Sequence, residues 1–347
     1  MKALVKFGLN DGDVQLRDVP EPRLQPGHVL IAAKAVGVCG SDIHMWRNGQ
    51  SWDVKLPVTL GHETAGEIAA VADDVKGWAV GDRVVCETAA VICGNCALCR
   101  TGQYNLCPQR EGYGAVRDGA FAELLLARPR VLHRIPDNVT FEQAAMTEPF
   151  AVAYNCLVER ARIAPGDTVV IQGAGAIGAL CLQVALLQGA GTAIVVGTDV
   201  DRHRLKILKT LGADYTIVIP ETSPETLIKT LDDGQGADVV VDATGVSSAL
   251  EQSLAMVRPA GSIVKVGWGP QPLNFSLDPL VAKAVTLYGA FSHTWKTWER
   301  ILSLFSTGRL DTDLISGGEV YDLEDWEKAF HDMESGLRIK SIMKMSR

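Results

Sequence analysis

The sequence contains no uninterrupted apolar segment near the ~18 residues that a membrane-spanning helix requires. Its first residues, Met1 to Phe7, lack the apolar run of a secretory signal peptide. A basic excess is also missing, because 33 lysines and arginines against 41 acidic residues give a formal net charge of −8. Proteins that bind nucleic acid or anionic membranes usually carry the opposite charge. We therefore expect a cytoplasmic protein with neither of these partners.

Internal repeats and low-complexity linkers are absent as well. Hydrophobic residues make up 47% of the chain and charged residues 21%, a balance typical of globular proteins with sizeable cores. At 347 residues the chain is long for a single core. Two domains are therefore expected.

Eight cysteines are present, and without a secretory signal they indicate metal binding rather than disulfides. Four thiolates in a short segment can complete a tetrahedral shell around zinc and leave no position for substrate. We predict such a structural zinc site, with redox-active or incidental thiols as the alternative. Its ligands would be Cys93, Cys96, Cys99 and Cys107.

The first third of the chain has the alternating apolar pattern of short strands. The predicted strands cover residues 2–7, 14–16, 29–36, 58–63, 65–71 and 83–86. Strands this short and this close together favour a compact, barrel-like β domain over alternating βαβ units.

A glycine-rich turn follows an apolar strand at 167–171 and precedes an apolar helical stretch. This is the context that a dinucleotide-binding fingerprint requires. Gly173 would permit the tight turn, Gly175 would let the backbone approach the pyrophosphate, and Gly178 would allow close packing of the helix. Ala176 and Ile177 begin the helix, whose N-terminus favours the anionic pyrophosphate.

Asp199 ends the next predicted strand, 21 residues after Gly178. There it would accept hydrogen bonds from the adenosine ribose and repel a 2′-phosphate, which favours NAD over NADP. The alternative is that Asp199 caps the following helix. Arg202 and His203 weaken the preference for NAD, and Arg204 is a further candidate for cofactor binding.

More strands alternate with helical stretches after Asp199, at 215–219, 238–242, 262–266 and 285–289. Six strands with crossover helices predict an α/β fold with a doubly wound parallel sheet. This rhythm stops near Phe291. We therefore assign 153–290 to a dinucleotide-binding domain and both 1–152 and 291–347 to the β-rich domain, with the active site between them.

A second set of metal-ligand types is spread along the chain. Cys39 lies in the stretch Gly37 to His44, His62 and Glu63 follow, and Glu148 comes much later. Thiolate, imidazole and carboxylate are ligands that zinc takes, and a catalytic site keeps one position open. Each residue alone is weak evidence for a metal site, since a lone cysteine is more often a small core residue than a ligand.

Together these motifs resemble the zinc-dependent medium-chain dehydrogenases, and within them the polyol (sorbitol dehydrogenase-like) branch. The resemblance spans nearly the whole chain and implies a GroES-like catalytic domain, with a structural zinc lobe at 93–107, and a Rossmann domain. The matching segments are 37–44, 61–63, 81–84, the four cysteines from 93 to 107, 148–149 and 173–178.

The resemblance implies roles for individual residues. Cys39, His62 and Glu63 would bind the catalytic zinc, and Glu148 would be a fourth ligand or hold the zinc-bound water. A carboxylate that merely stabilises a helix start is the alternative for Glu148. Ser41 and His44 match the proton-relay positions of the family, with a turn hydroxyl and a surface imidazole as alternatives.

The implied reaction is oxidation of a secondary hydroxyl of a polyol or sugar-like alcohol to a ketone, with hydride transfer to NAD. It implies two zinc ions per subunit and a homotetramer or homodimer. One alternative is L-threonine 3-dehydrogenase, which commonly has threonine where Ser41 stands. A catalytically silent NAD-binding protein is the other, which the complete ligand set argues against.

Residues near the relay and after the second domain are candidates for the substrate pocket. A surface position is the preferred interpretation of Arg47, and a core or interface position that of Trp295 and Trp298. The segment 262–268 fits either a core strand or a subunit interface. The pocket candidates are Met45, Trp46, Arg47, Asn48, Trp52, Phe121, His293 and Trp295.

Overall fold

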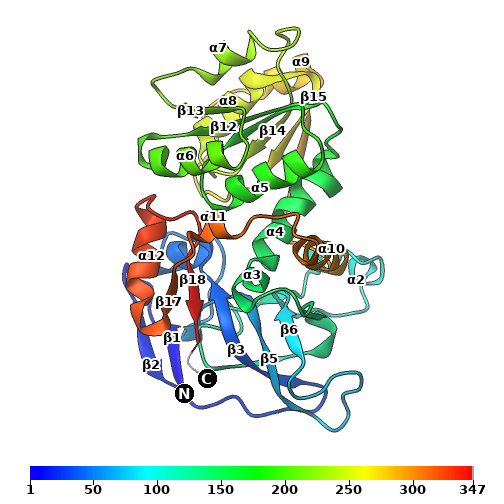
Figure 1. Cartoon of the computed structure of the whole chain (residues 1–347), viewed down its shortest axis with the longest axis vertical. Helices are drawn as coiled ribbons and strands as arrows, with labels where there is room; N and C mark the ends of the chain where they lie inside the picture. Colours follow the sequence, from blue (N-terminus) through cyan, green and yellow to red (C-terminus); the bar gives the residue numbers. More distant parts are fainter. Residues whose placement is uncertain (346–347) are drawn as a thin grey trace.

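The computed structural model describes residues 1–345 and shows an elongated molecule with a sheet system at each end (Figure 1). The lobe at the top of the figure holds a six-stranded sheet in which every neighbouring pair is parallel. In spatial order its strands are β13 (Tyr215–Val218), β12 (Thr192–Gly197), β11 (Thr168–Gln172), β14 (Ala237–Asp242), β15 (Val257–Lys265) and β16 (Thr286–Gly289).

This order reverses direction at β11, the first strand in sequence, so the sheet is doubly wound as predicted. All five residues of β11 are buried, because helices cover both faces of a parallel sheet. The segment 262–268 includes the end of β15, which pairs with strands on both sides, so the core-strand interpretation is confirmed there. The connecting helices are α5 (Ala176–Leu187), the short η4 (Asp199–Asp201), α6 (Arg202–Thr210), α7 (Pro224–Ile228), α8 (Ser247–Met256) and α9 (Asp278–Ala282).

The lower lobe is built on a seven-stranded sheet with two smaller sheets beside it. The main sheet contains β10 (Leu132–Arg134), β6 (Arg83–Cys86), β5 (Glu63–Val71), β3 (Val29–Gly37), β18 (Ile342–Lys344) and β17 (Val320–Asp322), with β9 (Leu124–Ala127) paired to β3. The smaller sheets are β2 (Val14–Asp18), β1 (Lys2–Lys6) and β4 (Val58–Thr59), and the pair β7 (Ala89–Val91) and β8 (Glu111–Gly112).

Both ends of the chain contribute to the main sheet. Strand β18 pairs antiparallel with β3, with Ile342 opposite Gly37, so the red end of the ribbon lies beside the blue beginning (Figure 1). The segment after β16 thus returns to the first sheet, although residues 346–347 lie outside the described residues. It forms α10 (Trp295–Ser306), α11 (Asp313–Ser316), η5 (Leu323–Asp325) and α12 (Trp326–Glu334).

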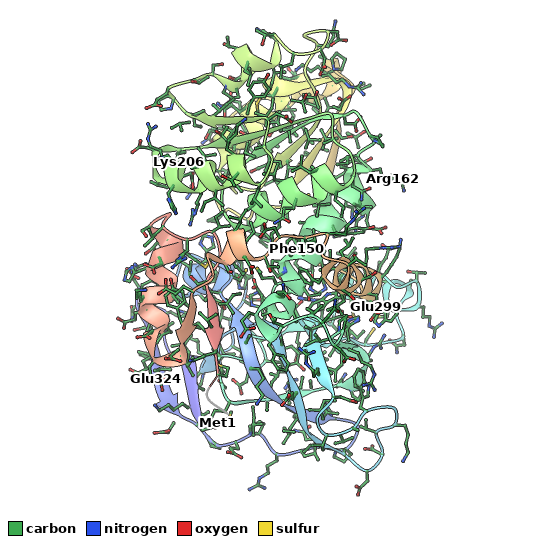
Figure 2. All side chains as sticks on the ribbon, viewed as in Figure 1. Met1, Phe150, Arg162, Lys206, Glu299 and Glu324 are labelled. Carbon is green, nitrogen blue, oxygen red and sulfur yellow. The ribbon has the colours of Figure 1, made fainter. Side chains whose placement is uncertain are left out.

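A continuous helical segment crosses the predicted domain boundary at 152/153. Helix α4 (Thr147–Tyr154) runs directly into the π-helix η3 (Asn155–Ala161). Phe150 of α4 is completely buried and lies between the two lobes (Figure 2). It belongs to a core cluster that includes Ala35 of the lower sheet and Ile171 of the upper sheet. The helix does not break there because its apolar side chains pack into a core shared by both sheets. The domain boundaries, including 152/153, stay predictions.

The strand predicted over 58–63 is shorter in the structure, where β4 ends at Thr59. Gly61 has a φ of +89°, a left-handed conformation that favours glycine. A Cβ at Gly61 would also lie 2.8 Å from the backbone nitrogen of Phe121. The chain therefore turns sharply before His62.

The remaining helices of the lower lobe are short. They are α1 (Gly40–Trp46), α2 (Ala97–Arg100), η1 (Tyr104–Leu106), η2 (Pro129–Val131) and α3 (Phe141–Ala145). Among residues 1–345, no helix combines the length and apolar character needed to traverse a bilayer.

Candidate active site and metal centres

Three of the predicted catalytic zinc ligands meet where β3 and β5 pair. Cys39 follows β3 and caps α1, while His62 and Glu63 stand at the start of β5, with Gly37 opposite Glu63 in the sheet register. One ligand atom of each residue lies within 4.8 Å of the ligand atoms of the other two. A thiol, an imidazole and a carboxylate at this separation suit a three-ligand zinc site with an open position.

Asp42 holds the two ligand-bearing segments together, a role that the sequence analysis did not assign. Its carboxylate is fully buried and accepts hydrogen bonds from the backbone N–H of Cys39 (2.9 Å) and of Gly61 (3.3 Å). One carboxylate oxygen also lies 3.9 Å from Nδ1 of His62. A carboxylate behind a metal-binding histidine fixes the orientation of the ring.

The electrostatics of this group favour a bound cation. Burial alone lowers the pKa of His62, but Asp42, Cys39 and Glu148 outweigh it and raise that pKa to about 10. Burial raises the pKa of Glu63, although the ammonium of Lys340 opposes this effect. Oε2 of Glu63 accepts no hydrogen bond among the described residues, although the Lys340 ammonium forms an ion pair with it at 2.5 Å. A buried, anionic group with such an oxygen fits a divalent cation.

Lys340 is a second residue that sequence analysis missed. Its ammonium is 1% exposed, donates to Glu63 and donates to the carbonyl of Val38 (2.7 Å). Burial lowers the pKa of Lys340, but the charges of Glu63 and Cys39 produce a net increase. Lys340 just precedes β18, so only the pairing of β18 with β3 brings it to this position.

Glu148 lies beside Cys39, His62 and Glu63 but does not belong to the group whose ligand atoms all lie within 4.8 Å of one another. It stands in the first turn of α4 and is 7% exposed, so the helix-start interpretation also applies to it. Its Oε1 lies 3.2 Å from Nε2 of His293. Burial raises the pKa of Glu148, but the contact with His293 reverses this effect and gives a net decrease.

Ser41 and His44 lie three residues apart on α1, which places them on one face of the helix. Ser41 is half-buried and His44 is exposed. The His44 ring lies edge-on to Trp52 at a centroid distance of 6.4 Å. The pair therefore extends from the ligand-bearing end of α1 to solvent.

The four-cysteine lobe has the dimensions of a zinc site. The Sγ atoms of Cys93, Cys96, Cys99 and Cys107 all lie within 4.8 Å of one another, and all eight cysteines of the chain are free. The 3.8 Å between Sγ of Cys93 and Sγ of Cys99 matches the edge of about 3.8 Å in a tetrahedron with Zn–S bonds of about 2.3 Å. Backbone N–H groups of Asn95 and Cys96 lower the pKa of Cys93 to about 6, which favours the thiolate there, whereas burial raises the pKa of Cys99 to about 12.

The glycine turn has the backbone geometry that the fingerprint requires. Gly173 has a φ of +102°. A Cβ at Gly178 would collide with the carbonyl oxygen of Gly173, whereas a Cβ at Gly175 would meet nothing within 4 Å. Ala176 and Ile177 form the first turn of α5 behind this open space. An anion there would face unpaired backbone N–H groups.

Asp199 projects into solvent after β12, with 84% of its side chain exposed, and accepts a hydrogen bond from Nε of Arg202 (2.7 Å). The alternative interpretation of Asp199 as a helix cap is wrong. Thr198 is the capping residue, and Asp201 completes the capping box by accepting the Thr198 N–H (3.0 Å).

The prediction that Arg204 binds the cofactor is not supported by its position. Arg204 is 8% exposed, and its guanidinium donates to the carbonyls of Met333 and Arg338 and to the carboxylate of Asp201. Helix α6 turns this side chain toward the lower lobe, so its donors are occupied. Arg204 links the two lobes instead.

Most of the predicted pocket residues near α1 lie in the core or at the surface. Met45, Trp46 and Phe121 are buried in the core cluster of the lower lobe. The surface interpretation of Arg47 is confirmed, because its guanidinium pairs with Glu334 (2.6 Å) and Asp11 (3.3 Å). Asn48 is exposed beyond the end of α1.

A series of aromatic rings lies next to His44 and was only partly foreseen. Trp52 contacts Trp268 at a centroid distance of 5.7 Å, and Trp268 contacts Phe291 at 5.9 Å. Trp52 was a predicted pocket residue, whereas Phe291 was not. Trp268 comes from the upper lobe, so these rings bridge the two lobes. Trp295 is half exposed, and Trp298 is buried, as the core interpretation predicted.

Two family descriptions match the chain, "Alcohol dehydrogenase GroES-like domain" over residues 25–137 and "Zinc-binding dehydrogenase" over residues 176–307. The chain belongs to the zinc-binding dehydrogenase family. These matches confirm the predicted fold class, with a GroES-like domain beside a parallel dinucleotide-binding sheet.

Individual relatives of this dehydrogenase match over nearly the whole chain. A sorbitol dehydrogenase of Halalkalibacterium halodurans is 40% identical over 344 residues, with 99% of each chain covered. An L-threonine 3-dehydrogenase of Pyrococcus furiosus is 35% identical, covering 99% of this chain and 97% of the relative. Among solved structures, a zinc-binding dehydrogenase from Sinorhizobium meliloti 1021 bound to NADP has a TM-score of 0.90 at 26% identity, with 99% of this chain and 98% of that chain covered.

The family and the geometry together confirm the predicted class of protein and its cofactors. This dehydrogenase is an oxidoreductase that acts on small-molecule alcohols, with zinc and a nicotinamide dinucleotide as cofactors. Cys39, His62 and Glu63 fit the catalytic zinc, and the four-cysteine lobe fits the structural zinc. The interpretation as a catalytically silent protein is therefore set aside.

Proposed function

We propose that this dehydrogenase oxidises a secondary hydroxyl of a polyol or sugar-like alcohol to a ketone, with NAD as the hydride acceptor. The observation that carries the proposal is the three-ligand group of Cys39, His62 and Glu63, with Glu148 beside it. The 40% identity to a sorbitol dehydrogenase over 344 residues supports a polyol as the substrate.

Different residues of the chain have different roles in the proposed reaction. Zinc, when bound by Cys39, His62 and Glu63, supplies a Lewis acid that makes a hydroxyl more acidic. Ser41 accepts the hydroxyl proton and gives its own hydroxyl proton to His44, which passes a proton to solvent from the exposed end of α1. Trp52, Trp268 and Phe291 form a series of rings beside His44 and offer apolar surface next to this proton path.

The nicotinamide dinucleotide supplies the hydride acceptor, and the glycine turn binds it. We assign the pyrophosphate to the N-terminus of α5, where Gly175 leaves open space. Asp199 is exposed at the end of β12, where a carboxylate suits ribose hydroxyls and repels a 2′-phosphate. This supports NAD over NADP, although Arg202 partly neutralises Asp199. The homo-oligomeric state and the cytoplasmic location stay predictions.

L-threonine is the second candidate substrate, because one relative at 35% identity is an L-threonine 3-dehydrogenase. The two candidates differ in charge: L-threonine carries an ammonium and a carboxylate, and a polyol carries neither. The ring series of Trp52, Trp268 and Phe291 offers apolar faces to a substrate, which suits the C–H faces of a neutral polyol.

The test is NADH formation by zinc-loaded protein with polyols, inositols, simple secondary alcohols and L-threonine, each with NAD and with NADP. The proposal predicts turnover with at least one polyol and NAD, and none in Cys39→Ser. Turnover with L-threonine alone would transfer the assignment to the second candidate. Preference for NADP would contradict the role given to Asp199.

A further inference from the structure

The side chain of His293 is completely enclosed beside Glu148. It is 1% exposed and directly precedes Thr294, the N-cap residue of α10. Its Nδ1 lies 2.6 Å from Nε1 of Trp298, and its Nε2 lies 3.2 Å from Oε1 of Glu148 and 3.3 Å from Oγ1 of Thr88. Sequence analysis had named His293 only as a candidate pocket residue.

The direction of these hydrogen bonds follows from the chemistry of the Trp298 indole and of the Glu148 carboxylate. An indole N–H can only donate, so Nδ1 of His293 must carry the lone pair that accepts from Trp298. The hydrogen of the neutral ring is then on Nε2, where it faces Oε1 of Glu148 (3.2 Å) and Oγ1 of Thr88 (3.3 Å), of which the carboxylate is the stronger acceptor. An ionised carboxylate can only accept, so the chain of bonds from Trp298 to Glu148 runs in one direction.

Trp298 is itself held in place. It is 1% exposed, and its ring stacks on His133 at a centroid distance of 5.4 Å and an interplanar angle of 10°. His133 is fixed by Glu87 at 2.9 Å and by Glu299 of α10 at 2.6 Å, and Figure 2 labels Glu299 beside this helix. The indole N–H therefore has little freedom to leave Nδ1 of His293.

We propose that His293, held by Trp298 as the Nε2–H tautomer, is a positioning residue for Glu148 at the catalytic metal centre. The bond occupies Oε1 and leaves the second oxygen of Glu148 for the centre formed by Cys39, His62 and Glu63. Without it, Glu148 is a buried carboxylate free to rotate in the first turn of α4. The assignment rests on the proposed role of Glu148 beside zinc.

Proton–nitrogen correlation spectra of metal-free protein, labelled with nitrogen-15 in its seven histidines, report the tautomer directly. The His293 signal is identified by its loss in His293→Gln. We expect the Nε2–H pattern in the wild type and a mixture of tautomers in Trp298→Phe, which lacks the indole donor. Trp78→Phe is the matched control, because Trp78 packs against Arg134 in the lower lobe. The Nδ1–H tautomer in the wild type would overturn the proposal.

Cobalt(II) binding to protein whose four-cysteine lobe is filled with zinc provides the second readout. Loss of a hydrogen-bond partner behind a metal site typically costs about 10–100-fold in metal affinity or activity. We expect His293→Leu to bind cobalt(II) about 10–100-fold more weakly and to change the visible absorption spectrum of the bound cobalt(II). His293→Gln, which keeps an N–H donor, should recover most of the loss. Equal losses in both variants would show a merely structural role and overturn the proposal.

Both readouts are independent of turnover, so an inactive wild type would contradict the proposed function without deciding this proposal.

Discussion

Replacing Lys340 by methionine tests the charge balance of the catalytic centre. The variant removes the ammonium that pairs with Glu63 while keeping an unbranched chain of similar length. Lys340 is 1% exposed and Glu63 is 0% exposed. Removing one partner of such a buried pair costs about 3–5 kcal/mol, because the remaining charge is uncompensated. The cost should be largest in metal-free protein, where no divalent cation faces Glu63.

The size of the effect can be converted into a melting temperature. An unfolding entropy of about 2.1 cal/mol/K per residue gives about 0.7 kcal/mol/K for 347 residues. A loss of about 3–5 kcal/mol then lowers the melting temperature of metal-free protein by about 4–7 °C. Bound zinc supplies positive charge to Glu63, so the decrease should be smaller in zinc-loaded protein.

Scanning calorimetry of both forms measures these shifts. The matched control is Lys344→Met, since Lys344 pairs with Asp322 at the surface with 59% of its side chain exposed, and exposed pairs contribute about 0–1 kcal/mol. Adding Glu63→Gln to the Lys340 variant should restore stability in the metal-free form, because it removes the unpaired charge. Equal melting temperatures for Lys340→Met and Lys344→Met, or equal decreases with and without zinc, would refute the reasoning.

Three further predictions concern the other sites. Cys96→Ser should lower the zinc content by one ion per chain in metal analysis, because the lobe then offers three thiolates; retention of both ions would contradict a four-cysteine site. Asp199→Ala should shift the ratio of kcat/KM for NADP over NAD upward by about tenfold, which corresponds to about 1.4 kcal/mol of removed repulsion; an unchanged ratio would remove Asp199 from cofactor selection. Gly178→Ala should weaken NADH binding in a fluorescence titration, because the added methyl collides with the carbonyl of Gly173; wild-type affinity would show that the turn adapts.

The four-cysteine lobe and the dinucleotide turn were predictable because each depends on residues close together in sequence, whereas the catalytic zinc ligands, spread from Cys39 to Glu148, were assigned through the family resemblance. The four cysteines lie between residues 93 and 107, and the roles expected of Gly173 and Gly178 follow from backbone geometry within one turn. The central strands of the parallel sheet were predictable as well, because buried strands such as β11, β12 and β14 are apolar nearly throughout.

Residues brought in by tertiary packing were not predictable. Lys340 is 277 positions from Glu63, and its approach depends on β18 pairing with β3. His293, which contacts Glu148, lies 145 positions from it in the sequence, and Trp298 lies farther still. Arg204 was misassigned because sequence distance from the glycine turn does not reveal which lobe its side chain faces. The strand predicted over 58–63 was too long because apolar alternation continues through Gly61, where the backbone turns.

The most direct test of the account combines zinc stoichiometry with NADH formation on the same samples of wild type and Cys39→Ser. The account predicts two zinc ions per chain and polyol-dependent NADH formation in the wild type. It predicts one zinc ion and no NADH formation in Cys39→Ser, with the four-cysteine lobe still filled. Polyol turnover that persists in Cys39→Ser after loss of the second zinc ion would contradict the claim that this centre carries the reaction.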